Sequence, residues 1–466
     1  MQQLPEKFKE NVRSMLTQEA ELFFASLFNE PATTIRLNTL KPINTYNQCK
    51  VVDWCDTARY LTKRPSFIAD PLFHAGAYYV QEASSMFIQH AFKYITQNNN
   101  TPLKVLDLCA APGGKTTLLQ SLLTDDDLLV ANEIIKTRVP VLEENIVKWG
   151  RANMVITNND SKDFKKLKHY FDVILVDAPC SGEGMFRKDK QAIEEWSEEN
   201  VQLCTERQQR IIANIYDSLK PGGYLIYSTC TFNTNENEEN VQWMMEQFGL
   251  QSVQIPNSNF KGVTSVSQFN NIPLNAYRFY PHHVNSEGFF MACLQKPKEQ
   301  ETSNQANFKT QQQAKLAPAL IEAVNYWLTN PISFEITTKE TFVFAYPKQL
   351  YTQMVYLKSF LNIKLAGLYL GEFIKNKIVP SHQLALSIHL NNSVPKLPTT
   401  LIDALKYLRK DTFATPNLVQ DIYLITYNNL GIGWAKIMPN RMNNYLPTNW
   451  RILKDLNQLL NSNENS

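Results

Sequence analysis

Residues 104–120 read KVLDLCAAPGGKTTLLQ, and this stretch decides the fold. Its apolar start, KVLDLC, is typical of a buried strand, and the segment that begins at Lys115 is typical of a helix. Between the two, Gly113 and Gly114 allow the backbone to approach a ligand closely, and the N-terminus of the helix favours negative charge. The stretch therefore predicts a ligand-binding turn between a strand and a helix.

Two common nucleotide-binding motifs do not fit this turn. GGKT occurs in P-loops, but a P-loop needs a glycine five residues before Gly114, and that position is Cys109. The dinucleotide fingerprint G-x-G-x-x-G does not match the stretch either. The turn thus belongs to another class of α/β site.

The segments that follow alternate between strand and helix patterns up to residue 295, which is typical of a parallel sheet with crossover helices. Helices are predicted at 115–123, 136–150 and 198–219, and Pro221-Gly222-Gly223 is a stop signal for the last of them. The predicted fold is α/β and Rossmann-like. Its predicted strands are KVLDLC (104–109), LLVANE (128–133), MVITN (154–158), DVILVDA (172–178) and YLIYSTC (224–230).

Two acidic residues end consecutive predicted strands. Glu133 closes the second strand, where an acid suits a ribose diol, and Asp160 follows the third, where it is placed to reach an adenine amino group. Each alone is equally well explained as a solvated strand end. Their joint placement favours a cofactor that contains adenosine.

Two cysteines also follow neighbouring predicted strands. Asp177 and Cys180 come at the end of the fourth strand, and Cys230 ends the fifth. A single cysteine is more often a small buried apolar residue than a reagent. Because neighbouring strand ends of a doubly wound sheet meet over one crevice, however, we expect the two thiols to lie together there.

Paired thiols in such a crevice suit one particular reaction. Carbon 5 of a pyrimidine is a poor nucleophile, but a thiolate that adds to carbon 6 makes an enamine whose carbon 5 attacks a methyl donor. A base then removes the carbon-5 proton and the thiol leaves. Asp177 is the candidate acid beside ring nitrogen 3. The sequence DAPC, where amino-group methylases commonly carry a D-P-P-Y type of loop, favours a ring carbon as the acceptor.

Taken together, DLCAAPGGKT (107–116), VDAPCSGEG (176–184) and IYSTCT (226–231) resemble the NOL1/NOP2/Sun family of RNA 5-methylcytosine methyltransferases. The segments TIRLNTLK (34–41), AYYVQEASSM (77–86) and 278–294 are similar to family segments as well. The resemblance implies a class I S-adenosylmethionine-dependent methyltransferase.

The resemblance also implies roles for single residues. Cys230 would be the nucleophile that forms a covalent RNA adduct, and Cys180 would assist release of the product. S-adenosylmethionine would meet Glu133 at its ribose, Asp160 near its adenine and Asp177 near its methionine end. Asp177 thus has two candidate roles, which the sequence does not separate. The implied cofactor loop consists of Cys109, Ala110, Ala111, Pro112, Gly113, Gly114 and Lys115.

The chain of 466 residues is too long for one hydrophobic core and indicates about three domains. KPKEQETSNQANFKTQQQAK (296–315) has one aromatic residue among many Gln, Lys, Asn and Thr, and it is predicted to be a linker. The predicted units are a small N-terminal α+β, RNA-positioning region (1–90), the catalytic domain (91–295), an intermediate domain (316–385) and a PUA-like RNA-binding domain (386–466).

Composition excludes several other classes of protein. No stretch of about 18 apolar residues occurs, and the N-terminus is polar, so neither a membrane span nor a signal peptide is expected. The seven cysteines contain no C-x-x-C pair, which argues against a disulfide framework or a zinc site. We expect a cytoplasmic monomer without a metal.

The C-terminal third is the basic part of the chain. From Ala317 onward 14 Lys and Arg stand against 9 Asp and Glu, a balance of +5, whereas the whole chain has +2. Segments 366–386 and 421–452 resemble the tail of the bacterial branch of the family, which acts on small-subunit ribosomal RNA and ends in a PUA-like module. The candidates for RNA contact are Trp434, Lys436, Arg441, Tyr445 and Trp450, of which the two tryptophans are equally well explained as core.

Three functions stay open at this point. The first is methylation of carbon 5 of a cytosine in small-subunit ribosomal RNA, either as naked RNA or within the subunit. The second keeps the chemistry but takes tRNA, because the catalytic motifs are shared across the family. The third is a non-catalytic ribosome-assembly factor, and the two retained thiols argue against it.

Overall fold

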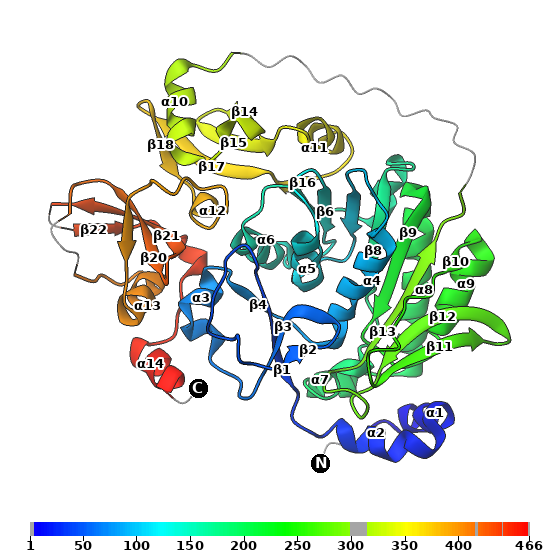
Figure 1. The fold of residues 1–466 in the computed structure, drawn as a ribbon. Coiled ribbons are helices and arrows are strands. Elements are labelled where there is room, and N and C mark those ends of the chain that lie inside the picture. Colours follow the sequence, from blue (N-terminus) through cyan, green and yellow to red (C-terminus); the bar gives the residue numbers. More distant parts are fainter. Residues whose placement is uncertain (1–3, 299–314, 415–417, 440, 465–466) are drawn as a thin grey trace.

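The computed structural model describes residues 4–298, 315–414, 418–439 and 441–464. Its centre is a ten-stranded sheet (Figure 1), whose middle five strands are parallel and run in the order β9-β8-β5-β6-β7. The predicted Rossmann-like fold is confirmed. These strands are β5 (Lys104–Asp107), β6 (Leu128–Asn132), β7 (Met154–Thr157), β8 (Phe171–Asp177) and β9 (Leu219–Thr229).

Antiparallel strands extend the sheet at both edges. Next to β9 lie β13 (Phe289–Gln295), β12 (Ile272–Phe279) and β11 (Val263–Phe269), and the short β10 (Gln251–Ser252) also pairs with β13. At the opposite edge β16 (Ile363–Ala366), which comes from beyond residue 315, pairs with β7. The catalytic sheet is therefore completed by the C-terminal part of the chain.

Helices cover both faces of this sheet because side chains alternate along each strand. Val105 contributes to the core under α4 (Phe87–Thr96), α5 (Gly114–Leu122) and α6 (Val139–Trp149). Leu106 contributes to the core on the other face, under α8 (Glu198–Ile215), α9 (Glu238–Phe248) and α11 (Tyr351–Lys358). Both cores fix the carboxyl ends of the parallel strands at one edge.

The predicted stop at Pro221-Gly222-Gly223 is placed differently in the structure. Helix α8 ends at Ile215, one short turn follows, and β9 begins at Leu219 and runs through the Pro-Gly-Gly stretch. Gly222 N–H donates to Lys296 O, and Lys296 N–H donates to Gly223 O, so this stretch is paired with the end of the antiparallel flank. Pairing across the sheet, which local sequence does not reveal, decides its conformation.

The N-terminal region consists of a helical part and a small sheet. Helices α1 (Glu6–Leu16) and α2 (Ala20–Ser26) pack Phe8 and Phe23 against Phe186, Trp196 and Phe232 of the catalytic domain. The sheet has the order β2-β3-β1-β4. Its strands are β1 (Thr33–Leu37), β2 (Val51–Val52), β3 (Cys55–Leu61) and β4 (Tyr78–Val80).

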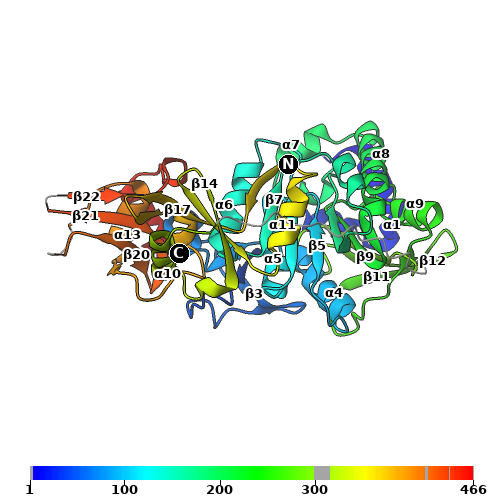
Figure 2. The same ribbon diagram turned by 90° about the horizontal axis from the view of Figure 1, so that it is seen from above.

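Beyond residue 315 the chain forms two further four-stranded sheets: the first (yellow) lies at the top of Figure 1, over the central sheet, and the second (orange to red) lies at the left in both views (Figure 2). The first consists of β14 (Phe334–Lys339), β15 (Phe342–Pro347), β17 (Leu368–Ile374) and β18 (Lys377–Pro380), covered by α10 (Pro318–Trp327). The second consists of β19 (Lys396–Pro398), β20 (Ile422–Tyr427), β21 (Leu430–Met438) and β22 (Arg441–Asn444) and packs α13 (Leu401–Arg409) against α3 (Pro71–His74).

One of the residues predicted to contact RNA lies in the core instead. Trp434 is 1% exposed, its indole N–H donates to Ser381 O at 2.8 Å, and its ring contacts Trp327 at 5.2 Å between centroids. The core explanation is therefore correct for Trp434. Lys436 and Arg441 are exposed, whereas Tyr445 and Trp450 are half-buried.

The C-terminal end of α6 joins three parts of the chain. Lys41 of the N-terminal region donates from Nζ to Lys148 O at 2.6 Å. From the C-terminal part of the chain, Ile388 N–H and Ser387 Oγ donate to Gly150 O at 3.1 and 3.3 Å. Gly150 itself has a φ of +93°, and a Cβ there would lie 2.5 Å from Leu386 O. This contact leaves room for glycine only.

Candidate active site

A pocket of about 190 Å³ opens at the carboxyl ends of β5 and β8. The cofactor loop of the sequence forms one wall, and residues around β4 form the opposite wall. From the predicted site the lining contains Cys109, Ala110, Ala111, Pro112, Gly114, Lys115 and Asp177, and from the N-terminal region it contains Tyr79, Val80, Gln81, Glu82 and Ser85.

The Gly-Gly turn begins α5 as predicted. Gly113 has a φ of +110° and stands at the N-cap, and a Cβ there would lie 3.3 Å from the Leu142 side chain. Glycine has no side chain to cap the helix, so the first N–H groups of α5 face the pocket without a side-chain acceptor. A helix start of this kind favours an anion.

Asp177 is held by two donors at the end of β8. Lys115 Nζ donates to its Oδ2 at 2.6 Å, and Ser228 Oγ donates to its Oδ1 at 2.8 Å. Burial lowers the pKa of the Lys115 ammonium, but Asp177 and the thiolate form of Cys230 outweigh burial and hold this pKa above its usual value. Lys115 is therefore a fixed positive charge that pairs with Asp177 and interacts with a negative charge at Cys230.

The two predicted catalytic thiols lie together. Cys180 Sγ and Cys230 Sγ are 3.3 Å apart, and both side chains are half-buried. The hydrogen bond with Cys230, together with burial, raises the pKa of Cys180 well above its usual value. Gly184 N–H donates to Cys230 O at 2.8 Å, and a Cβ on Gly184 would lie 2.7 Å from that oxygen. The backbone at Cys230 is thus fixed by a close glycine contact.

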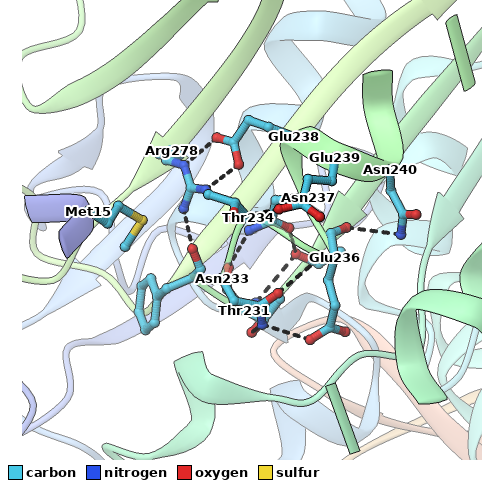
Figure 3. A network of polar contacts seen from close by, with 12 residues as sticks. Met15, Thr231, Asn233, Thr234, Glu236, Asn237, Glu238, Glu239, Asn240 and Arg278 are labelled. Atoms are coloured by element: carbon cyan, nitrogen blue, oxygen red, sulfur yellow. Dashed lines mark hydrogen bonds and ion pairs between the residues drawn. The ribbon is translucent and has the colours of Figure 1, made fainter. Parts of the chain in front are cut away.

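Most of the polar run after Cys230 is buried, and Figure 3 shows how its side chains satisfy one another. Asn237 Nδ2 donates to Thr231 O at 3.0 Å, and Asn240 lies on the same helix start. Arg278 forms a buried ion pair with Glu238 and donates from Nη1 to Phe232 O at 2.6 Å. A run that resembles a solvated surface in the sequence therefore forms the rigid base of the nucleophile loop.

Two buried carboxylates join the loops of the two cysteines. Glu236 accepts Ser181 N–H at 3.0 Å and Asn233 Nδ2 at 2.8 Å, and burial raises its pKa. Glu183 accepts Phe232 N–H at 2.8 Å and Asn233 N–H at 2.9 Å. Each carboxylate bridges one cysteine loop to the other, which holds the two thiols in register. The sequence analysis assigned no role to either glutamate.

The two acids predicted for the adenosine end lie outside the pocket lining. Glu133 is 2% exposed, accepts Ile135 N–H at 2.8 Å and pairs with Arg138 at 3.4 Å. Arg138 also donates to Ala111 O at 2.6 Å and so ties Glu133 to the cofactor loop. Asp160 accepts Lys162 N–H at 2.9 Å and begins a short helical turn. Their roles toward a cofactor stay predictions.

The N-terminal wall of the pocket was missed, although its segment AYYVQEASSM carried part of the resemblance. Within this wall Glu82 is fully engaged, because it accepts the N–H groups of Ser84, Ser85 and Glu287 at 2.8, 2.8 and 2.9 Å. Glu82 therefore has a structural role, whereas Gln81, which also lines the pocket, has a buried amide nitrogen that makes no hydrogen bond within the described residues.

Family models match four parts of the chain. Residues 94–295 match the model described as 16S rRNA methyltransferase RsmB/F, and residues 4–83 match the N-terminal domain of 16S rRNA methyltransferase RsmF. Residues 327–388 match the RsmF rRNA methyltransferase first C-terminal domain, and residues 394–452 match the methyltransferase RsmF PUA domain.

Similar whole proteins cover nearly all of the chain. Ribosomal RNA small subunit methyltransferase F from Vibrio atlanticus is 30% identical, over 95% of this chain and 97% of that protein. The protein of the same name from Pectobacterium atrosepticum is 29% identical, over 95% of each chain.

In all the described part of the chain, no helix is long and apolar enough to cross a membrane.

Solved structures resemble about two thirds of the chain. A methyltransferase homolog from Pyrococcus horikoshii has a TM-score of 0.54 and 28% identity, and it covers 63% of this chain and 95% of its own. NSun6 from Pyrococcus horikoshii with SFG has a TM-score of 0.51 and 22% identity, over 63% and 99%, which shows the fold alone.

Proposed function

Because this chain belongs to the RsmB/F family of 16S rRNA methyltransferases, we propose that it methylates carbon 5 of a cytosine in small-subunit ribosomal RNA with S-adenosylmethionine. The observation that carries the proposal is the pair of thiols, 3.3 Å apart, beside the Lys115–Asp177 ion pair. A thiol pair next to fixed charges supplies both the nucleophile and the group for its release.

The pocket fits S-adenosylmethionine. The start of α5 favours an anion, and Asp177 offers a carboxylate to an ammonium group. We assign Cys109 to Lys115 to the cofactor loop, Glu133 to the ribose and Asp160 to the adenine. When bound, this cofactor supplies an electrophilic methyl group.

Cys230 performs the first step on the base. Its thiolate forms a bond to carbon 6 of the cytosine, and the ring electrons move to carbon 5, to which bound S-adenosylmethionine would supply the methyl group as its methyl–sulfur bond breaks and S-adenosylhomocysteine is left. Lys115 supplies the fixed positive charge near this thiol, because a negative charge at Cys230 is one of the causes that raise the pKa of Lys115. Asp177 has two candidate roles, and both stay open. It either stabilises charge at ring nitrogen 3 of the cytosine or binds the methionine end of S-adenosylmethionine.

Cys180 acts in the release step. A proton leaves carbon 5, the bond between Cys230 sulfur and carbon 6 breaks, and the double bond of the ring is restored. The hydrogen bond with Cys230 is the largest cause of the raised pKa of Cys180. In the adduct the sulfur of Cys230 is bonded to carbon and carries no negative charge, so Cys180 loses its proton more readily and becomes the base.

The test traps the adduct. Purified Cys180→Ala protein is incubated with S-adenosylmethionine and bacterial RNA that lacks the modification, and the mixture is run on a denaturing gel. We expect a slowly migrating RNA–protein band that is missing in Cys180→Ala/Cys230→Ala. Cys204→Ala is the matched control, because Cys204 is buried in α8, and it should turn over like the wild type.

The same experiment separates the alternatives. Sequencing of the trapped RNA identifies small-subunit ribosomal RNA or tRNA as the substrate, and trapping with naked RNA or with isolated subunits shows which form is used. Methyl transfer by a wild-type protein whose Cys180→Ala variant traps nothing would contradict the two-thiol mechanism. A protein that binds RNA but neither traps it nor methylates it would be the non-catalytic assembly factor.

A further inference from the structure

The side-chain amide of Gln81 is buried, and only one of its two polar atoms forms a hydrogen bond within the described residues. Gln81 is 7% exposed, and its Oε1 accepts Arg36 Nε at 2.9 Å. Its Nε2 is buried, makes no hydrogen bond within the described residues, and lies on the pocket wall beside the start of α5, 3.7 Å from where a Cβ of Gly114 would stand. A buried donor without an acceptor is destabilising, so a ligand acceptor is expected at this point.

Arg36 lies behind Gln81 and supplies positive charge. It is fully buried, and its guanidinium donates to Gly114 O at 3.2 Å, Thr117 Oγ1 at 2.6 Å and Ser121 Oγ at 3.2 Å. Burial lowers its pKa to about 10, which leaves it charged at neutral pH. In the described part of the chain no carboxylate forms an ion pair with it. Its hydrogen bond to Gln81 polarises the amide towards an anion.

The charges around the pocket decide which group of the cofactor lies where. Asp177 attracts an ammonium group and repels a carboxylate. The uncapped start of α5, Gln81 Nε2 and the buried Arg36 attract a carboxylate on the N-terminal side. Glu82 is engaged by four hydrogen bonds and does not compete for an ammonium group.

We propose that Gln81 Nε2 binds the α-carboxylate of the methionine part of S-adenosylmethionine, with Arg36 as the positioning residue that orients and polarises the amide. The inference rests on the proposed function, because it requires that this pocket takes S-adenosylmethionine. Because Arg36 lies on β1, this strand then belongs to the cofactor site and not only to the predicted RNA-positioning region.

Titration calorimetry of the full-length protein tests the assignment with two ligands, S-adenosylmethionine and its decarboxylated form, which lacks only the carboxylate. Gln81→Glu keeps an acceptor for Arg36 and removes the donor. We expect it to weaken S-adenosylmethionine binding about 10- to 100-fold and to change binding of the decarboxylated ligand by less than about threefold. Gln202→Glu, the same change on the exposed face of α8, should alter neither affinity.

Equal weakening of both ligands, or no weakening of either, would overturn the assignment. A wild-type protein that binds neither ligand contradicts the proposed cofactor itself and is thus a separate result. If Gln81→Glu does not fold, the wild type is measured by NMR: the Gln81 side-chain amide signals should shift with S-adenosylmethionine and stay in place with the decarboxylated ligand. A shift with neither ligand, but with added RNA, would assign the amide to the base instead.

Discussion

The residues around the thiols show how one fixed cation supports a nucleophile. Lys115 pairs with Asp177 and interacts with a negative charge at Cys230, on a loop that is held from both sides, so its charge does not move away from the thiol. A cation beside a cysteine favours the thiolate. The reactivity of Cys230 should therefore depend on Lys115 more than on the distant basic residues of the C-terminal part.

We expect Lys115→Met to slow alkylation of Cys230 by iodoacetamide roughly tenfold at neutral pH, since the thiolate loses a neighbouring positive charge. The rate is read by mass spectrometry of the peptide that contains Cys230, in a Cys180→Ala background. Lys162→Met, a change at an exposed lysine, should leave the rate unchanged. An unaltered rate in Lys115→Met would show that this charge does not activate the thiol.

A second prediction concerns Asp107, which lies at the end of β5 below the cofactor loop. Thr116 Oγ1 donates to its Oδ2 at 2.6 Å, but burial raises the pKa of Asp107 to about 7. The folded protein therefore holds this proton more tightly than the unfolded chain, and Asp107 makes the protein less stable as pH rises from about 4 to 7.

Asp107→Asn should remove this dependence, because the amide keeps an acceptor for Thr116 and carries no charge. Urea unfolding at pH 5 and pH 8 measures the stability of the variant and of the wild type. We expect the stability difference between the two pH values to shrink by about 1–3 kcal/mol in the variant. Identical differences in variant and wild type would mean that Asp107 does not titrate in this range.

Among the elements, the end of α6 fixes the C-terminal third of the chain to the catalytic domain. Gly150 and Gly249 both follow a helix and both have positive φ, at +93° and +65°. A Cβ on Gly150 would lie 2.5 Å from Leu386 O, whereas nothing lies within 4 Å of one on Gly249. Backbone strain is thus common to the two positions, and only Gly150 has a close neighbour.

Gly249→Ala should cost about 1 kcal/mol through strain alone. Gly150→Ala should cost about 2 kcal/mol more, because Leu386 and the hydrogen bonds to Gly150 O must shift. Thermal or urea unfolding of the two variants measures the difference. Equal destabilisation would show that the segment around Leu386 adapts without loss.

The five parallel strands could be predicted from the sequence because each is a short apolar run, and runs of that kind in alternation with helices have few other solutions. The polar run after Cys230 could not be predicted as buried, since its Asn and Glu side chains satisfy one another only in three dimensions. Gln81 and Arg36 were not predicted as site residues for the same reason. They meet behind the loop at Gly114, which lies 78 residues after Arg36, and no local pattern in the sequence indicates such a contact.

At the scale of the whole molecule, the catalytic sheet depends on the C-terminal third. β16 pairs with β7, and α11 packs Met354 and Leu357 into the core of the same face. Tyr170 of the catalytic domain also stacks on Tyr356, with ring centroids 5.7 Å apart. These contacts could not be predicted from the sequence, because an edge pairing between distant segments leaves no local pattern.

A chain that ends at residue 298 should therefore expose the edge of β7 and apolar surface, and it should aggregate. Size-exclusion chromatography measures this. Production together with the segment 315–466 should restore a soluble complex. A monomeric 1–298 chain that unfolds at the temperature of the full-length protein would contradict this dependence.

The pairing of β16 with β7 also sets the order of events during synthesis. Strands β5 to β9 leave the ribosome first, yet the edge of β7 has no neighbour until residues 363–366 have emerged. A nascent chain therefore has an incomplete sheet while roughly two hundred residues are translated, from the end of β7 at Thr157 to the start of β16 at Ile363. An enzyme whose proposed target is ribosomal RNA is thus made beside a ribosome that it is not yet built to modify.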